Sequence, residues 1–319
     1  MTTKMTLTPL NMLFPDVAFK EPGISIAVFD NEASVPLNPY YVPQPDVLEE
    51  LLVELSLPAD GALGLVGETG TGKSEMVAFL AHYLRIPLAV VQVNPSMRPE
   101  QVEGGMELRV KDGCSVSEYV EQCVVQRYRD GGLILIDEID KFDSPVQSAL
   151  HPLCDYKELY VEGIGLIKPH RFTKIVATAN TVGDGGSMHY TNSVVVDAAL
   201  RSRFCYLELG YPAPKLEFDI LTNHYPDMHG ELLKQLINVA GKIRASFENG
   251  AVGLPVSTRT LVGWCHSIKM FRAKPLKDSF GFVYANSLPE DERQAAFDTL
   301  HACMGDDVEL PMPELLKKL

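Results

Sequence analysis

Hydrophobic residues in the first two thirds of the chain form short, almost continuous runs, separated by stretches with the spacing of amphipathic helices. Such runs are typical of parallel strands, because helices cover both faces of a parallel sheet. We predict strands at 61–66, 87–93, 133–136, 172–177 and 205–209, helices at 46–55, 73–85 and 116–127, and a loop followed by a helix within 140–156. The pattern therefore predicts an α/β unit with a parallel five-stranded sheet flanked by helices.

Two segments interrupt this alternation. Residues 96–113 are charged and show no clear period, which predicts an irregular insert. Residues 158–168 surround Gly163-Ile164-Gly165, and glycines between short apolar runs predict a small hairpin.

The N-terminal segment differs in composition from the rest of the chain. It is rich in proline, and only residues 23–29 have the pattern of a strand, so we predict an extended arm over residues 1–45. Such an arm could clasp a neighbouring subunit or partner, or be a flexible tail. The first strong helix follows, with Asp46 as its cap and Glu49 at the capping-box position.

Beyond residue 210 the chain shows only helical patterns. They predict helices at 214–224, 231–247, 257–271 and 289–304. We therefore predict an α/β domain at 46–210 and a small all-helical domain at 211–319, in addition to the arm.

Composition limits the classes of protein to consider. The 319 residues are 46% hydrophobic, and the six cysteines form no C-x-x-C pair, so we expect cores without disulfide bonds, reduced thiols and no zinc site. No apolar run has the length of a membrane span and the first residues lack a signal-peptide layout, which predicts a cytoplasmic protein without a membrane contact. The net charge of −14 disfavours a surface that tracks nucleic acid.

One segment joins the first predicted strand of the sheet to a helix and has the pattern G-x-x-x-x-G-K-[ST]: Gly67-Glu68-Thr69-Gly70-Thr71-Gly72-Lys73-Ser74. Glycines let successive backbone N–H groups point at one spot, and the helix that follows adds its partial positive charge there. The segment therefore predicts a cradle for phosphate groups. Lys73 would reach the β- and γ-phosphates and the Ser74 hydroxyl would ligate Mg²⁺.

Polar residues end two later strands. Asp137 and Glu138 follow the apolar run at 133–136, and the carboxyl ends of parallel strands are where α/β sheets place ligands. Asp137 would hold Mg²⁺ through water, and Glu138 would accept a proton from the water that attacks the γ-phosphate. Asn180 follows the strand at 172–177, and its amide would position that water.

The order of these motifs, with Arg203 and a helical tail after them, resembles the AAA+ ATPases. The insert at 96–113 and the hairpin before Asn180 resemble the helix-2-insert members, the MoxR group. Several short motifs are similar to CobS-like cobaltochelatase ATPase subunits, and others to the CbbQ and NorQ activases. The CobS-like motifs include Lys168-Pro169-His170, Ala177-Thr178-Ala179-Asn180 and Ser257-Thr258-Arg259-Thr260, and the activase-like ones His151-Pro152-Leu153-Cys154-Asp155 and Tyr211-Pro212-Ala213-Pro214.

The resemblance implies roles for three arginines. Arg203 would be an arginine finger that reaches the γ-phosphate of a neighbouring subunit, with Arg201 as the less favoured candidate. Arg259 would sense the nucleotide from the helical domain, which would act as a lid. A finger supplied to a neighbour requires a ring, so the resemblance implies a homohexamer, and a von Willebrand factor A-type partner protein.

Three functions remain open from the sequence. The first is a CobS-like motor subunit for metal insertion, the second a CbbQ/NorQ-type activase of a metalloenzyme, and the third a nucleic-acid motor, which the acidic charge disfavours. A metal site of His151, His170 and His189 is rejected, because no pair has the spacing of ligands on a helix. Met188, His189 and Tyr190, in a glycine-rich loop, are predicted instead to contact substrate or partner.

Overall fold

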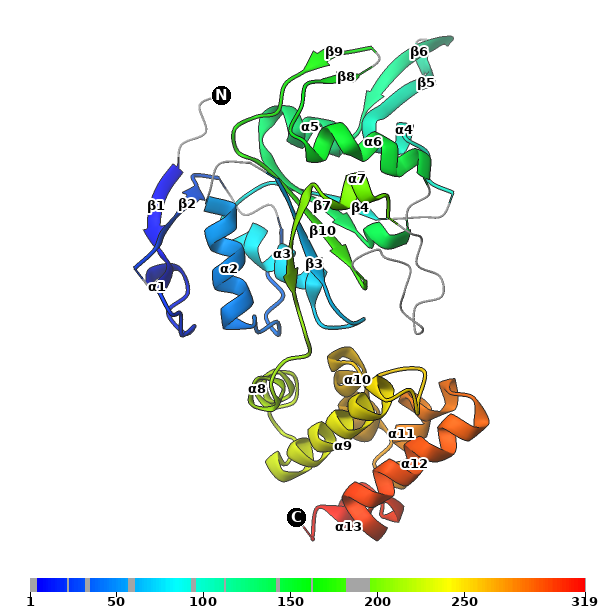
Figure 1. The fold of residues 1–319 in the computed structure, drawn as a ribbon. Coiled ribbons are helices and arrows are strands. Elements are labelled where there is room, and N and C mark those ends of the chain that lie inside the picture. The colour runs from blue at the N-terminus through cyan, green and yellow to red at the C-terminus, as the bar shows by residue number, and fades with distance from the viewer. Residues whose placement is uncertain are drawn as a thin grey trace. The chain divides into compact units, whose positions relative to one another are not determined.

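The computed structural model describes residues 5–318 except 22, 32–34, 57–60, 93–95, 112, 142–143, 162 and 182–195. The chain divides into two compact units (Figure 1). The first contains the residues up to 209 apart from 40–42 and 69–71, and the second contains those two short segments and the residues from 210 onward. No helix of the described residues is both long enough and apolar enough to cross a membrane.

A parallel five-stranded sheet is the centre of the first unit, as the sequence predicts, with the strand order β11-β3-β10-β7-β4. The bounds are β3 Ala62–Val66, β4 Leu88–Gln92, β7 Gly132–Asp137, β10 Thr173–Ala179 and β11 Phe204–Glu208. Helices flank the sheet (Figure 1): α2 Pro45–Ser56, α3 Lys73–Tyr83, α5 Cys123–Asp130, α6 Ser144–Cys154 and the short α7 Ala198–Arg201. Residues 132–136 of β7 are all buried, which explains the unbroken apolar run.

Strand register brings the ends of the central strands together. Ala179 of β10 pairs with Val66 of β3, and Ala177 of β10 pairs with Ile136 of β7. Because these strands are parallel, the phosphate-loop segment after β3 and the polar residues after β7 and β10 leave the sheet at the same edge. The phosphate loop, Asp137, Glu138 and Asn180 therefore share one end of the sheet, whereas Arg203 precedes β11 at the opposite end.

The helix predicted at 116–127 is wrong. Residues there form strand β6 Cys114–Glu121, followed by the start of α5, and the insert is not irregular but contains α4 Glu100–Glu103 and strand β5 Gly104–Lys111. The two strands pair antiparallel over eight residues each. Val116, Tyr119 and Val120 have helical spacing, but pairing with β5 overrides it. The dipeptide Asp112-Gly113 was the hairpin signal that the helical pattern concealed.

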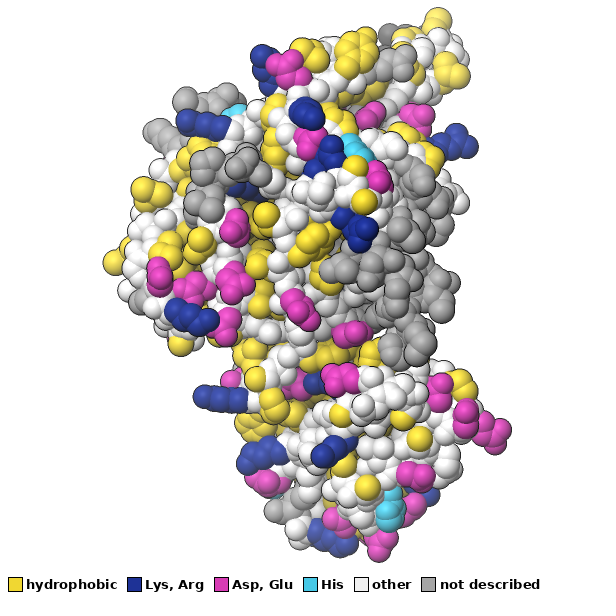
Figure 2. Space-filling view, in the orientation of Figure 1, with side chains coloured by type: hydrophobic (Ala, Val, Ile, Leu, Met, Phe, Trp, Pro, Cys, Tyr) yellow, Lys and Arg dark blue, Asp and Glu magenta, His cyan; other side chains and the backbone are white. Residues whose placement is uncertain are grey.

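A second hairpin, β8 Leu159–Val161 with β9 Gly165–Ile167, confirms the prediction at 158–168. Both hairpins carry exposed apolar side chains, including Leu108 and Val110 of β5, which are 80% and 75% exposed. Hydrophobic side chains gather on this part of the surface, at the top of the view in Figure 2.

The N-terminal segment packs on the α/β unit. The predicted strand at 23–29 is present as β2 Ser25–Phe29, which pairs antiparallel with β1 Met5–Pro9, and α1 Leu10–Leu13 follows β1. Phe14 is buried, and its ring lies 5.7 Å from that of Phe79 on α3. The described part of this segment is therefore held by apolar contacts.

The predicted cap of α2 is also wrong, because the helix begins at Pro45 and includes Asp46. Asp46 pairs instead with Lys20, Nζ to Oδ1 at 3.0 Å. The Glu49 carboxylate, predicted to close a capping box, accepts hydrogen bonds from the backbone N–H groups of Lys20 and Glu21 at 2.9 and 2.6 Å. Two acidic residues of α2 thus hold the preceding segment.

The second unit is helical, as predicted. Its helices are α8 Pro214–His224, α9 Gly230–Glu248, α10 Thr258–Met270, α11 Leu276–Val283, α12 Glu290–Met304 and α13 Met312–Leu315, with short 3₁₀ segments η2 Ala285–Ser287 and η3 Gly305–Glu309. Ser257 caps α10 by accepting the Thr260 N–H at 3.0 Å. Trp264, in the core, donates to the Ser279 hydroxyl at 2.9 Å.

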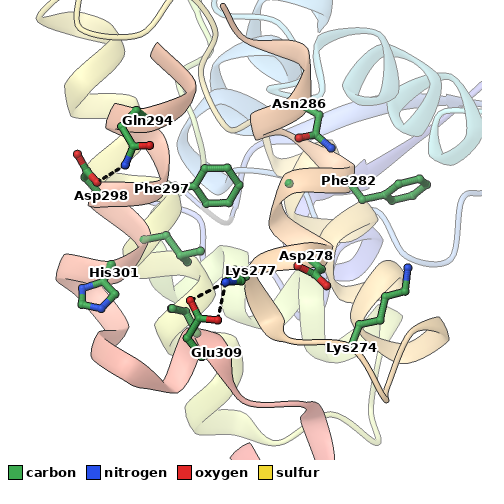
Figure 3. A pocket seen from close by; sticks show the side chains of 13 residues that line it. Lys274, Lys277, Asp278, Phe282, Asn286, Gln294, Phe297, Asp298, His301 and Glu309 are labelled. Atoms are coloured by element: carbon green, nitrogen blue, oxygen red, sulfur yellow. Dashed lines mark hydrogen bonds and ion pairs between the residues drawn. The ribbon is translucent and has the colours of Figure 1, made fainter. Parts of the chain in front are cut away.

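A cavity of about 640 Å³ opens in the helical unit, with residues of α11 and α12 on its walls (Figure 3). Lys277 and Glu309 pair across one part of it, at 2.5 Å, and Phe297 lines another. Lys277 and Glu309 both belong to the helical unit, so this ion pair forms within one unit.

Candidate active site

The phosphate-loop segment lies between β3 and α3, as predicted. Gly72 has φ +96°, a conformation that glycine adopts without strain, and Lys73 begins the helix. The first helical hydrogen bond runs from Met76 N–H to the Gly72 carbonyl at 2.9 Å, so the N–H groups of residues 73–75 have no acceptor within the helix. At Gly67 a Cβ atom would lie 2.1 Å from the Leu209 carbonyl oxygen. The loop needs glycine there for close packing.

Lys73 is almost buried, with 9% of its surface exposed. Its ammonium donates to the carbonyls of Gly67 and Glu68, at 2.7 and 2.9 Å, and to the Asn180 Oδ1 at 3.0 Å. Burial lowers the pKa of Lys73 to about 8, and the negative charge of Asp140 is the largest effect in the opposite direction. All three ammonium protons are therefore directed to uncharged oxygens.

Asp137 lies at the end of β7 and accepts two short hydrogen bonds at the same oxygen. The hydroxyls of Ser74 and Thr178 each donate to its Oδ1 at 2.6 Å. The structure thus joins the end of β7, the start of α3 and β10 through one carboxylate. Thr178, which is 1% exposed, is a site residue that the sequence prediction missed.

Glu138 has φ +60°, in the left-handed region that costs a residue with a side chain about 1–2 kcal/mol. Its N–H donates to the Thr178 hydroxyl at 2.9 Å, and its Oε2 pairs with the Lys141 ammonium at 2.7 Å. Lys141 ends the 3₁₀ segment η1 Ile139–Lys141. The carboxylate of Glu138 thus contacts the residue that ends the segment immediately after β7.

Asn180 follows β10 and contacts both Lys73 and Asp140. Its Oδ1 accepts from Lys73, and its N–H donates to the Asp140 Oδ2 at 3.1 Å. Asp140 is 0% exposed and was also missed by the sequence prediction. The signal for Thr178 is a polar side chain within the apolar run of β10, and Asp140 belongs to the acidic segment Asp137-Glu138-Ile139-Asp140 that begins at the end of β7.

The three arginines with predicted roles in nucleotide hydrolysis have no contact with Lys73, Ser74, Asp137 or Asn180 among the hydrogen bonds and ion pairs described for these residues. Arg203 is half-buried and forms an ion pair with Asp155, Nε to Oδ1 at 2.7 Å, and it also donates to the Ala199 carbonyl. Hydrogen bonds from Lys157 and then Arg203 lower the pKa of Asp155. Arg201 ends α7, and Arg259 lies exposed in the first turn of α10 in the helical unit. The structure brings Lys73 into contact with Asn180, and Ser74 into contact with Asp137. The roles of the three arginines remain predictions.

The histidines of the rejected metal site contact different residues. His151 Nε2 pairs with the Asp197 Oδ2 at 3.2 Å, and His170 Nδ1 accepts the Phe172 N–H at 3.3 Å. His189, together with the predicted contact residues Met188 and Tyr190, lies outside the described residues.

The residues at this edge fit a nucleotide with Mg²⁺. Oxygen atoms of Ser74 and Asp137 are the hard ligands that Mg²⁺ takes, and they are already adjacent. The N–H groups of the first turn of α3 and the Lys73 ammonium are donors for phosphate oxygens. The residues that would hold the phosphates and those that would hold the ion are therefore neighbours at the start of α3.

The chain is similar to known proteins in sequence. Residues 62–204 match the family model described as AAA domain (dynein-related subfamily). The aerobic cobaltochelatase subunit CobS of a Sinorhizobium species is 26% identical over 267 residues, which cover 79% of this chain and 80% of that protein. Protein CbbQ of Hydrogenophilus thermoluteolus is 26% identical over 234 residues, 73% of this chain and 82% of that protein.

The fold has a counterpart among solved structures. A mutant of RuvB from Thermotoga maritima matches with a TM-score of 0.50 and 16% identity, over 87% of this chain and 76% of that one. At this identity the likeness concerns the fold alone. The family model therefore shows an AAA domain over residues 62–204 of this chain, which is similar in sequence to CobS and CbbQ.

Proposed function

We propose that this protein hydrolyses ATP between the subunits of a ring and uses the energy to remodel a partner protein or to insert a metal ion. The observation that carries the proposal is a pair of contacts at the same edge of the sheet, Lys73 with Asn180 and Ser74 with Asp137. Each has the chemistry that phosphoryl transfer requires at its position.

Each of these residues has a different role in the proposed hydrolysis. Glu138 accepts a proton from the attacking water, and the Asn180 amide orients that water. Lys73 exchanges its hydrogen bonds to the loop carbonyls for bonds to the β- and γ-phosphates, where its charge offsets the charge of the transition state. Ser74 and Asp137 would hold Mg²⁺, which when bound neutralises phosphate charge.

Ring assembly follows from the proposed role of Arg203. In the single chain, Asp155 holds the Arg203 guanidinium, so the side chain is ordered at a half-buried position. An ordered arginine offered to the γ-phosphate of the next subunit would complete each site. We propose a homohexamer, with Arg259 as the nucleotide sensor of the helical lid unit.

The client is proposed from the relatives. The likeness to CobS, a cobaltochelatase subunit, favours metal insertion. The activase-like motifs in the sequence favour the remodelling of an enzyme, and in both cases we propose a von Willebrand factor A-type partner protein. The net charge of −14 disfavours the third candidate, a nucleic-acid motor. We further propose that the protein acts in the cytoplasm.

The first experiment replaces Glu138 with Gln. This variant should bind ATP with the affinity of the parent but lose turnover, because the amide cannot accept the proton. Phosphate release and fluorescent-nucleotide binding measure the two quantities, and undiminished hydrolysis would refute Glu138 as the base.

A second experiment tests the ring. Arg203→Ala should lower turnover only under conditions in which the protein assembles, and mixing it with Glu138→Gln subunits should restore some activity where an intact finger meets an intact base. Hydrolysis at the full rate by a monomer would contradict the shared site.

A third experiment identifies the client. The Glu138→Gln protein, held with ATP, should retain its partner during purification. A tetrapyrrole-binding subunit among the captured proteins would favour metal insertion, a folded metalloenzyme would favour the activase, and salt-dependent DNA binding in a shift assay would favour the nucleic-acid motor.

A further inference from the structure

The Thr178 hydroxyl connects the two acidic residues that the proposed mechanism assigns to different tasks. It donates to the Asp137 Oδ1 at 2.6 Å and accepts the Glu138 N–H at 2.9 Å. A hydroxyl has one proton to donate, and here that proton is committed to Asp137. The same oxygen thus contacts the carboxylate at the strand end and the backbone of the next residue.

Burial and side-chain shape make this arrangement stiff. Thr178 is 1% exposed and lies in β10, the central strand of the sheet. A β-branched side chain in a strand has few rotamers, so the oxygen is fixed relative to the backbone. Ser74 donates to the same Oδ1 from α3, and Asp137 is therefore held from two elements at once.

Glu138 depends on the same oxygen for its backbone. Its φ of +60° is unfavourable, and the hydrogen bond from its N–H to Thr178 compensates for this conformation. Loss of the hydroxyl would leave that N–H without this acceptor and free the turn that aims the carboxylate.

We propose that Thr178 is a positioning residue that fixes the magnesium-holding carboxylate of Asp137 and the catalytic turn at Glu138 with a single hydroxyl. This inference rests on the proposed ATPase function. Under this proposal, the positions of the two acidic residues depend on a residue of β10 near Asn180, as well as on the phosphate loop and the end of β7.

The test compares three variants. Thr178→Val removes the hydroxyl and keeps the shape, and Thr178→Ser keeps the hydroxyl. Thr173→Val is the matched control, because Thr173 is a buried threonine at the other end of β10 whose hydroxyl donates to the carbonyls of Arg127 and Tyr128. Thermal unfolding of each variant separates loss of folding from loss of position.

Two readouts are measured, the Mg²⁺ concentration that half-saturates binding of a fluorescent ATP analogue, and kcat with KM for ATP. Residues that orient metal ligands change metal affinity or activity by about 10- to 100-fold. Thr178→Val should raise the Mg²⁺ midpoint and lower kcat within this range with little change in KM. Thr178→Ser and Thr173→Val should stay within about threefold of the parent, a margin well below that range.

Two results would overturn the inference: a Mg²⁺ midpoint unchanged in Thr178→Val, or an equal shift in Thr173→Val. If Thr178→Val does not fold, the comparison of Thr178→Ser with Thr178→Ala decides, and equal midpoints in those two refute the role of the hydroxyl. A parent protein that binds the analogue with Mg²⁺ but releases no phosphate would refute the proposed function, while the midpoints would still decide the role of Thr178.

Discussion

Each of the two units holds a cation with little exposed surface, Lys73 in the first and Arg244 in the second, and the partners of these cations differ. In the helical unit, Arg244 of α9 makes a bidentate pair with Glu217 of α8, at 3.0 and 2.7 Å, and donates to the Val256 carbonyl at 2.8 Å. Thr258 of α10 donates to the same carboxylate at 2.9 Å, and the guanidinium lies 4.0 Å from the centre of the Tyr211 ring. This charge is neutralised locally and ties three helices together.

Lys73 in the α/β unit has no comparable partner among its three hydrogen bonds, which all end on uncharged oxygens. Its pKa is lowered by burial, the reverse of what a close ion pair would do. The comparison teaches that a matched buried charge stabilises the fold, whereas a buried cation without a bonded carboxylate retains its charge for an anionic ligand.

The sharpest test of this contrast is Arg244→Met. Removing one partner of a buried ion pair leaves Glu217 charged and buried, which costs about 3–5 kcal/mol. Calorimetry should show the transition of the helical unit at a lower temperature, with Arg272→Met, an exposed arginine in the same unit, as the control. Equal stability in the two variants would contradict the claim that the ion pair of Arg244 with Glu217 stabilises the helical unit.

Lys73→Met should have the opposite profile. Nucleotide turnover should fall by about 100-fold or more, because a charge that stabilises the transition state is lost. The free energy of unfolding should stay the same or rise, since a buried ammonium without a bonded carboxylate is replaced by an apolar chain. Phosphate release and chemical denaturation measure the two effects, and a large loss of stability would contradict the ligand-binding interpretation of this lysine.

The pH dependence of nucleotide binding follows from the Lys73 pKa of about 8. Below this pH the ammonium is charged and binds phosphate; above it the free site loses its proton, and ATP affinity should fall by at most about tenfold per pH unit. Titration between pH 7 and pH 9.5 checks this, and the dependence should disappear in Lys73→Met.

The same pKa predicts a rise in stability with pH. Unfolded lysine titrates near 10.5 and folded Lys73 near 8, so between these values the unfolded state binds more protons. The contribution of Lys73 to the free energy of unfolding therefore increases across this window, by up to about 3 kcal/mol in total. Denaturation of the parent and Lys73→Met at pH 7.5 and pH 9.5 would reveal a difference in slope.

The smallest effect is expected for Lys141→Met. Lys141 pairs with Glu138 near the surface, where the two side chains are 40% and 46% exposed. Exposed pairs contribute at most about 1 kcal/mol, so stability should change little. If this variant nonetheless lost as much turnover as Lys73→Met, charge near the surface would matter as much as buried charge, and the comparison would fail.

The sequence by itself determined the sheet and most of the proposed site. Apolar runs predicted all five strands, because a parallel sheet buries both faces. The spacing of Lys73 and Ser74 in their loop, and the positions of Asp137 and Asn180 after strands, predicted residues that the structure joins by hydrogen bonds. These features are local, since a glycine loop and a strand end are read from neighbours in the chain.

Only the tertiary structure decided the features that depend on pairing between distant residues. Thr178 lies about forty positions from the two residues that it contacts, and no periodicity encodes a hydroxyl between them. The β5–β6 hairpin overrode a helical pattern because strand pairing outweighs local spacing. Likewise, the packing of Phe14 on Phe79 and the hydrogen bonds of Glu49 ordered a segment in which proline suggested an extended arm. Local patterns specify elements, whereas burial and long-range hydrogen bonds determine which side chains meet.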